Sequence, residues 1–237
     1  MKKKTYTGIV LAAGKGKRMK SEVQKQFLLL DGKPILFYSL DAFEKCEDID
    51  EVILVTGKES LQFCQTEIVE KFHFNKVKKV VAGGKERYDS VYEGLKAAEG
   101  CDYILIHDGA RPFLTQEILA RVIQGVTEHQ ACVAGVKSKD TIKLADEEGK
   151  VTQTPPRDSV WNIQTPQAFA YSLIRRAHDR IREGSMEGIT DDAMVVEALG
   201  SEVWLTEGSY ENIKITTPDD LTVGESILRS INKNSRM

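Results

Sequence analysis

Cysteines and long apolar runs are scarce in this sequence, and both shortages narrow the class of protein. Four cysteines in 237 residues are too few for a disulfide scaffold, and their spacing leaves no CxxC metal site. No segment is long and apolar enough to span a membrane. The apolar run after the first lysines stops at Gly14, too early for a signal peptide. We therefore expect a cytoplasmic protein with reduced, mostly structural thiols and no membrane partner.

An excess of charge of one sign is also missing. The 33 basic and 36 acidic side chains nearly cancel, giving a net charge of -3. Such a chain has no general attraction to nucleic acid, so any basic site must be local. With 41% hydrophobic residues, the chain can bury a proper core. We expect one domain over residues 1–237, with no nucleic-acid partner.

The standard nucleotide-binding motifs and nucleophile arrangements are absent as well. The dinucleotide fingerprint would begin at Gly14, but Met19 stands where its third glycine belongs. The P-loop pattern fails because Lys15 is followed by Gly16 rather than by Ser or Thr. No Ser/His/Asp or Cys/His set can be assigned. Chemistry that depends on a protein nucleophile is therefore not indicated.

The most informative segment that is present follows the first predicted strand. The strand runs into Leu11, Ala12, Ala13 and Gly14, and then into a group of cations. Small residues let backbone N–H groups approach a phosphate closely, and cations offset its charge. The cations are Lys15, Lys17, Arg18 and Lys25. The order is typical of a polyphosphate site; the alternative is a basic surface turn.

Short β-rich runs alternate with amphipathic segments through the first half of the chain. The strands are predicted at residues 7–11, 52–56, 79–82, 103–107 and 131–136. Helical periodicity is clearest at 88–98 and at 115–126, where Thr115 is a plausible N-cap. This alternation predicts an α/β fold with a single Rossmann-like, mostly parallel sheet flanked by helices.

Three loops follow the carboxyl ends of predicted strands, where ligands gather in such sheets. They contain Gly14, the pair Gly83-Gly84, and residues 107–111. Asp108 is placed to bind Mg²⁺ together with substrate phosphates, or else to cap the next turn. Arg111 is suited to holding a phosphate bidentately. His107, at the end of a buried strand, is expected to be structural.

The pattern changes near residue 138. Residues 141–144 and 151–154 are β-branched segments separated by a polar stretch, which predicts a hairpin. A pair this exposed is marginal alone, so we interpret residues 138–158 as an arm that reaches a second subunit. The alternative is a hairpin on the domain's own edge. Helices are predicted at 171–183, at 190–199 and from Pro218 onward.

Cations near small residues, without a nucleophile, favour nucleotidyl transfer to a phosphate monoester. The second pKa of such an acceptor is about 6, so its oxygen is mostly ionised at neutral pH and needs no protein base. What remains is alignment of the reactants and neutralisation of charge. These are tasks for Mg²⁺, Lys and Arg.

Eight ordered motifs resemble the 2-C-methyl-D-erythritol 4-phosphate cytidylyltransferases of the non-mevalonate isoprenoid pathway. The likeness covers nearly the whole chain. Its pieces are Leu11-Ala12-Ala13-Gly14 with Arg18 and Lys25-Gln26-Phe27; Gly83-Gly84 with Arg87, Asp89 and Ser90; His107-Asp108-Gly109-Ala110-Arg111-Pro112; Asp140-Thr141; Arg157; Thr165-Pro166-Gln167; Thr190-Asp191-Asp192; and Asn212-Ile213-Lys214.

The resemblance implies a nucleotidyltransferase that moves CMP from CTP to the acceptor, forms 4-diphosphocytidyl-2-C-methyl-D-erythritol and releases pyrophosphate. It also implies a set of nucleotide-binding residues: Leu11, Ala12, Ala13, Gly14, Gly83, Gly84, Ser90, Asp108 and Gly109. Mg²⁺ would lie on Asp108. Arg18, Lys25, Arg157 and Lys214 would be catalytic, the first two by stabilising the transition state.

By the same resemblance, five residues position the acceptor: Arg111, Thr141, Arg157, Thr165 and Lys214. The arm of this family crosses a homodimer. Arg157 and Thr141 would therefore serve the active site of the partner. One departure is Val23-Gln24 before Lys25, where the family commonly has proline, so the rigidity of the approach to the lysine is in question.

Two other functions stay open. A ribitol 5-phosphate cytidylyltransferase would run the same transfer on another acceptor; it typically has Ala-Gly-Gly in the first loop and Val before Arg-Pro, whereas this chain has Ala12-Ala13-Gly14 and Ala110-Arg111. A catalytically silent nucleotide-binding module is the other alternative. Retained cations directed at both reactants argue against such a module, because binding alone does not require them.

Overall fold

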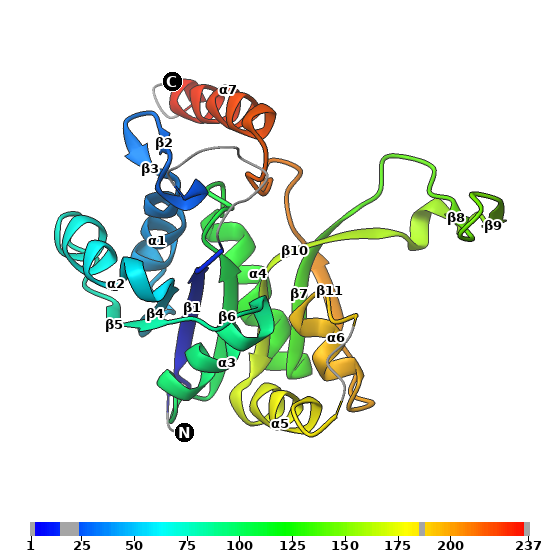
Figure 1. Ribbon diagram of the computed structural model, residues 1–237, viewed down its shortest axis with the longest axis horizontal. Coiled ribbons are helices and arrows are strands. Elements are labelled where there is room, and N and C mark those ends of the chain that lie inside the picture. Colours follow the sequence, from blue (N-terminus) through cyan, green and yellow to red (C-terminus); the bar gives the residue numbers. More distant parts are fainter. Residues whose placement is uncertain (1–2, 15–23, 185–187, 235–237) are drawn as a thin grey trace.

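A seven-stranded sheet forms the centre of the computed structural model, which describes residues 3–14, 24–184 and 188–234 (Figure 1). The strand order is β11-β7-β10-β6-β1-β4-β5. Every neighbouring pair is parallel except the two that involve β10. The mostly parallel sheet is therefore confirmed. The strands are β1 (Tyr6–Ala12), β4 (Glu51–Thr56), β5 (Val77–Ala82), β6 (Tyr103–Asp108), β7 (Ala131–Lys137), β10 (Trp161–Ala170) and β11 (Trp204–Glu207).

Both faces of the central parallel strands are buried, which explains why β1, β4 and β6 are largely apolar. Successive side chains of a strand point to opposite faces. In β1, Ile9 packs into one hydrophobic cluster and Val10 into the other, and Ile104 and Leu105 divide in the same way in β6. Continuous apolar runs of this kind are typical of parallel sheets covered on both sides.

Helices form the two outer layers. One face carries α1 (Ile35–Lys45), α4 (Gln116–His129) and α2 (Leu61–Phe63) with the helical turn η4 (Cys64–Glu70). The other face carries α3 (Arg87–Ala97), α5 (Tyr171–Ile181) and α6 (Asp192–Glu197). The last helix, α7 (Pro218–Asn234), packs over a third cluster beside the short strands β2 (Leu29–Leu30) and β3 (Lys33–Pro34). Figure 1 shows α7 at the C-terminal end of the chain, close to β2 and β3.

The helix starts follow the signals in the sequence. The Thr115 side chain accepts a hydrogen bond from the Ile118 backbone N–H, as expected of an N-cap. Glu86 and Asp89 form a reciprocal capping box at the start of α3. Asp191 caps α6, which therefore begins two residues after the predicted Thr190.

The predicted hairpin is present, but its strands are shorter than expected. Strands β8 (Leu144–Ala145) and β9 (Val151–Gln153) pair antiparallel in a sheet of their own. Figure 1 shows this arm projecting from the body of the molecule. Continued in the same register, residues 142 and 141 would face Pro155 and Pro156, which have no N–H group to donate, so the ladder cannot extend over the predicted length.

All four cysteines are free thiols, and Cys46, Cys64 and Cys132 are buried. Burial raises the pKa of the Cys101 and Cys132 thiols to about 11, so neither is poised to react at neutral pH. In the described ranges, no helix has both the length and the apolar character to cross a bilayer.

Candidate active site

A cavity of about 870 Å³ lies at the carboxyl edge of the sheet. The three loops predicted to converge there do so, and the loop after β4 joins them. The described lining residues are Leu11, Ala12, Ala13, Gly14, Lys25, Gln26, Gly57, Lys58, Glu59, Gly83, Gly84, Lys85, Glu86, Arg87, Ser90, Asp108, Ala110 and Lys214. Lys25, Lys58, Lys85, Arg87 and Lys214 bring five cations to it, against three carboxylates on Glu59, Glu86 and Asp108.

The glycine pair after β5 is required by close packing. A Cβ atom on Gly83 would lie 2.6 Å from the Ser90 hydroxyl and 2.8 Å from the Ala13 Cβ, and one on Gly84 would lie 2.3 Å from the Asp89 Cβ. The Ser90 hydroxyl accepts from the Gly84 N–H at 3.2 Å and donates to the Glu86 carbonyl at 3.2 Å. The two glycines thus seat the loop on the first turn of α3.

Asp108 is the centre of the charged network. Its carboxylate lies 2.6 Å from Lys214 Nζ and 3.4 Å from Arg87 Nε. Burial by itself raises the pKa of Asp108, but the charges of Arg87 and Lys214 hold that pKa well below its usual range. The carboxylate is therefore ionised at every pH at which the protein is expected to be folded.

Arg87 is the residue to which the sequence assigned no role. Its Nη2 lies 2.8 Å from Asp192 Oδ2, so the guanidinium bridges two carboxylates while lining the cavity. Burial lowers the pKa of Arg87, but the charges of Asp192 and Asp108 outweigh burial and raise it. One sequence signal could have pointed to this role. Arg87 begins the helix that follows the Gly83-Gly84 pair, at the carboxyl edge of the sheet where ligands gather.

A buried hydrogen-bond group lies beneath Asp108. The Asp108 backbone N–H donates to the Thr165 hydroxyl at 3.1 Å, and that hydroxyl is 3.0 Å from His107 Nδ1. His107 Nε2 lies 3.2 Å from the Arg111 carbonyl. Burial lowers the pKa of His107 to about 4. His107 is therefore neutral and structural, as the sequence predicted.

Among the described residues, the cavity lining omits Gly109, Arg111 and Thr165. The Gly109 N–H donates to the Leu11 carbonyl at 2.9 Å. The Arg111 Nη1 donates to the Asn212 carbonyl at 2.7 Å, and its Nε is buried without a partner. These residues shape the wall behind Asp108 and Lys214 in this structure.

Arg157 and Thr141 meet on the arm rather than at the cavity. Arg157 Nη2 donates to the Thr141 hydroxyl at 3.0 Å, and both residues are exposed. Lys25 lines the cavity from the turn Lys25–Phe27. Arg18, Lys15 and Lys17 lie outside the described residues.

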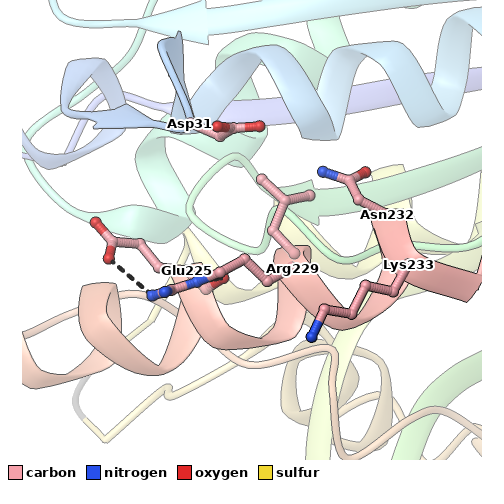
Figure 2. Close-up of a pocket in the computed structure, with 6 residues that line it drawn as sticks. Asp31, Glu225, Arg229, Asn232 and Lys233 are labelled. Carbon is pink, nitrogen blue, oxygen red and sulfur yellow. Dashed lines mark hydrogen bonds and ion pairs between the residues drawn. The ribbon is translucent and has the colours of Figure 1, made fainter.

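A second cavity, of about 520 Å³, lies between α7 and Asp31 (Figure 2). Arg229 pairs with Glu225 at 3.5 Å beside it, and both side chains are more than half exposed. Among the residues that the structure describes, its lining contains none that the sequence predicted for the site: Asp31, Glu225, Leu228, Arg229, Asn232 and Lys233. The residues predicted to bind nucleotide, except Gly109, line the cavity at the edge of the sheet.

Small residues that expose backbone, together with an excess of cations, are suited to a polyphosphate. At the carboxyl edge of a mostly parallel sheet, they define a nucleotidyltransferase of the α/β class. The chain belongs to the 2-C-methyl-D-erythritol 4-phosphate cytidylyltransferase family, whose model matches residues 7–230.

Relatives cover nearly the whole chain. The 2-C-methyl-D-erythritol 4-phosphate cytidylyltransferase of Lachnoclostridium phytofermentans is 49% identical over 94% of this chain and 96% of its own length. That of Clostridium botulinum is 48% identical over 94% and 97%. The crystal structure of 4-diphosphocytidyl-2C-methyl-D-erythritol synthase from Anaerococcus prevotii is 35% identical and superposes with a TM-score of 0.85 over 95% of this chain and 96% of that one.

Proposed function

We propose that this chain transfers CMP from CTP to 2-C-methyl-D-erythritol 4-phosphate and releases pyrophosphate. The observation that carries the proposal is the meeting of Lys25, Arg87 and Lys214 around one cavity, whose wall includes Ala12, Ala13 and four glycines. Relatives named for this activity extend over the same residues, at 48% identity or more. The product is 4-diphosphocytidyl-2-C-methyl-D-erythritol, an isoprenoid precursor.

The reaction needs alignment rather than a protein nucleophile. An oxygen of the acceptor phosphate attacks the α-phosphorus of CTP; the new O–P bond forms as the bond to the β-phosphate oxygen breaks, and pyrophosphate leaves with that electron pair. The attacking oxygen is already ionised, because the second pKa of a phosphate monoester is about 6. Cations that match the growing charge in the transition state supply the rate enhancement.

The nucleotide would lie over Leu11 to Gly14, with its base and ribose toward Gly83, Gly84 and Ser90. Lys25 stabilises the transition state from the cavity wall. Arg18, which lies outside the described residues, is assigned the same role by its place in the family motif. Lys214 and Arg111 position the acceptor. Gly109 and Thr165 act from behind the wall, through the Leu11 carbonyl and the Asp108 backbone.

A magnesium ion fits this donor set with one protein ligand. The described residues contain no group of three or more His, Cys, Asp or Glu that would hold a metal by themselves. Mg²⁺ commonly takes one or two carboxylates and fills its other positions with phosphate oxygens and water, so Asp108 on the cavity wall is sufficient. When bound, Mg²⁺ would neutralise phosphate charge. Lys214 contacts one Asp108 oxygen and Arg87 contacts the other, so both cations would then share the carboxylate with the ion.

We further propose one nucleotidyltransferase domain that works as a homodimer in the cytoplasm. Arg157 and Thr141 are joined to each other on an arm and do not line the cavity of their own described chain. An isolated two-stranded hairpin is marginal in water, so the arm gains its order from a partner surface. Its two side chains would position the acceptor in the partner's site. The free cysteines suit a reducing compartment.

Pyrophosphate release tests the proposal. CTP, UTP and ATP are each assayed with Mg²⁺ against 2-C-methyl-D-erythritol 4-phosphate and ribitol 5-phosphate. We expect turnover with CTP and the methylerythritol acceptor. Preference for ribitol 5-phosphate would assign the chain to the other cytidylyltransferase reaction. Nucleotide binding without turnover in any pair would leave a binding module.

A further inference from the structure

Lys25 is carried on a short turn between two glutamines. The turn Lys25–Phe27 is a single 3₁₀ turn in which Gln26 is only 2% exposed. Lys25 lines the cavity. A long lysine side chain can reach many positions, so the contacts that fix its backbone decide which phosphate oxygens it can meet.

The two glutamines form a continuous chain of hydrogen bonds beside the cavity, which Gln26, Ala12 and Glu59 line. Gln26 Nε2 donates to the Ala12 carbonyl at 2.5 Å and to Gln24 Oε1 at 2.6 Å. Gln24 Nε2 donates in turn to Ser60 Oγ at 3.2 Å and, more weakly, to Glu59 Oε1 at 3.4 Å. Both N–H groups of the buried amide are thereby used.

The direction of this chain is fixed by chemistry. The Ala12 carbonyl can only accept, so Gln26 must turn its nitrogen toward it. The second N–H of Gln26 then requires the oxygen of Gln24, which leaves the Gln24 nitrogen for the Glu59 carboxylate. One assignment of the two amides satisfies every partner.

The chain of hydrogen bonds ties the Lys25 turn to two adjacent strands. Ala12 ends β1, and the helical turn η3 (Lys58–Ser60) follows β4. Ala12 and Thr56 are opposite each other in the β1–β4 pair. On its other side, the turn is held by Phe27, whose ring packs edge-on against the Phe63 ring with 4.9 Å between the ring centroids.

We propose that Gln24 and Gln26 are positioning residues that hold Lys25 toward the phosphates of the nucleotide. This inference rests on the proposed function, which gives Lys25 its task. Gln26 acts through the Ala12 carbonyl, so it couples the Lys25–Phe27 turn to the end of β1, where the nucleotide-binding residues Ala12 to Gly14 begin. Gln24 supplies by hydrogen bonding the rigidity that a proline before Lys25 would supply through its ring.

Two substitutions test the two links separately. Gln26→Glu keeps the size of the side chain but replaces the N–H donors by a carboxylate that faces the Ala12 and Gln24 oxygens. Gln24→Leu removes the outer link at a partly exposed position. Each should lower kcat/KM for CTP by about 10- to 100-fold, the cost of a misplacement on the order of 1 Å. Gln65→Leu is the matched control, because Gln65 bonds Glu70 at 2.9 Å on the exposed surface.

A double-mutant cycle separates positioning from a general structural role. In a Lys25→Ala background, Gln24→Leu should change the residual rate by less than about twofold, because the group it positions is gone. If Gln24→Leu lowered the rate by the same factor in both backgrounds, the inference would be overturned. Near-normal turnover of Lys25→Ala alone would instead refute the catalytic role of Lys25, and no turnover by the unaltered chain would refute the proposed function itself.

A swapped pair provides rescue. Gln24→Glu places a carboxylate against Glu59 and should lower kcat/KM, whereas Gln24→Glu combined with Glu59→Gln restores a donor opposite an acceptor. Recovery of at least about half of the lost activity, on a logarithmic scale, supports the link, and no recovery contradicts it. Thermal midpoints of all variants are measured so that rates are compared well below unfolding.

Discussion

Lys214 Nζ lies 2.6 Å from Asp108 Oδ2, and this contact joins the two ends of the proposed chemistry. Asp108 is assigned to the nucleotide and its metal ion, while Lys214 is assigned to the acceptor. Arg87, at 3.4 Å from the other Asp108 oxygen, supplies a second counter-ion. Arg87 would keep the carboxylate paired if Lys214 turned toward a bound acceptor.

Loss of Lys25 should stop turnover without unfolding the protein. We expect Lys25→Ala to lower kcat by about 100-fold or more, the usual cost of removing one group that stabilises transition-state charge. Arg18→Ala should act in the same way. Lys45→Ala, which breaks an exposed ion pair with Asp41 at 2.6 Å, is the control. Pyrophosphate release and circular dichroism are compared, and near-normal kcat in either active-site variant would refute its role.

Asp192→Asn should be destabilising. Asp192 is fully buried and lies 2.8 Å from Arg87. Arg87, whose side chain is 28% exposed, keeps Asp108 as a second partner, so we expect a loss of roughly 1 to 3 kcal/mol of unfolding free energy. Asp179→Asn, in an exposed pair with Arg175 at 3.2 Å, should cost less than about 1 kcal/mol. Urea unfolding of both variants checks this, and equal losses would contradict the anchoring of Arg87.

Stability should fall as the pH drops from about 6.5 to about 4, partly through His107. Burial lowers the pKa of native His107 from 6.5 to about 4, so in this window the unfolded chain takes up a proton that the native protein does not. The full contribution is on the order of 3 kcal/mol, present above pH 6.5 and lost as the pH approaches 4. Burial also lowers the pKa of His178, which adds a loss of the same sign.

The slope of unfolding free energy against pH isolates the histidine term from any general effect of a substitution. We expect His107→Gln to have a flatter slope between pH 6.5 and 4.5 than the unaltered chain, whatever its absolute stability. Urea titrations at several pH values measure it. An unchanged slope would show that His107 does not titrate as its burial requires.

Active sites shared across a dimer should be recoverable by mixing chains. Arg157→Ala impairs the arm and Lys25→Ala impairs the cavity, so a heterodimer of the two contains one site with both parts intact. We expect mixed chains to regain activity toward half of the unaltered value per heterodimer. Sedimentation confirms assembly, and heterodimers that stay inactive would place each site within one chain.

The central parallel strands were predictable from local signals, because both of their faces are buried and they are largely apolar. The mostly exposed strand β11 was not predicted. Thr115 and the start of α3 were also readable, since caps depend on neighbouring residues. Strand β10 was not predicted. It carries Pro166 and several polar residues, and proline argues against a central strand; a shift of register between Ile163 and Gln167 accommodates it.

Gly14, Gly83 and Gly84 were found because each follows a strand end in the sequence, and Lys25 was found as part of the group of cations after the first strand. The pairing of Arg87 with Asp192 was not, because it joins a helix start in the first half of the chain to one in the second. Likewise, the sequence could not show that Thr165 supports the Asp108 backbone from below. Such contacts depend on where β10 enters the sheet, which no local pattern specifies.

The arm leaves from β7 and returns into β10, and these strands pair directly at its base. The Ser138 N–H donates to the Val160 carbonyl at 2.9 Å, and Lys137 is opposite Trp161. Everything between them can therefore lengthen, shorten or change in sequence while the register of the sheet is preserved. If Arg157 and Thr141 position the acceptor as proposed, exchanging residues 139–159 as a cassette would alter contacts with the acceptor while the strands that carry the nucleotide-binding loops stay unchanged.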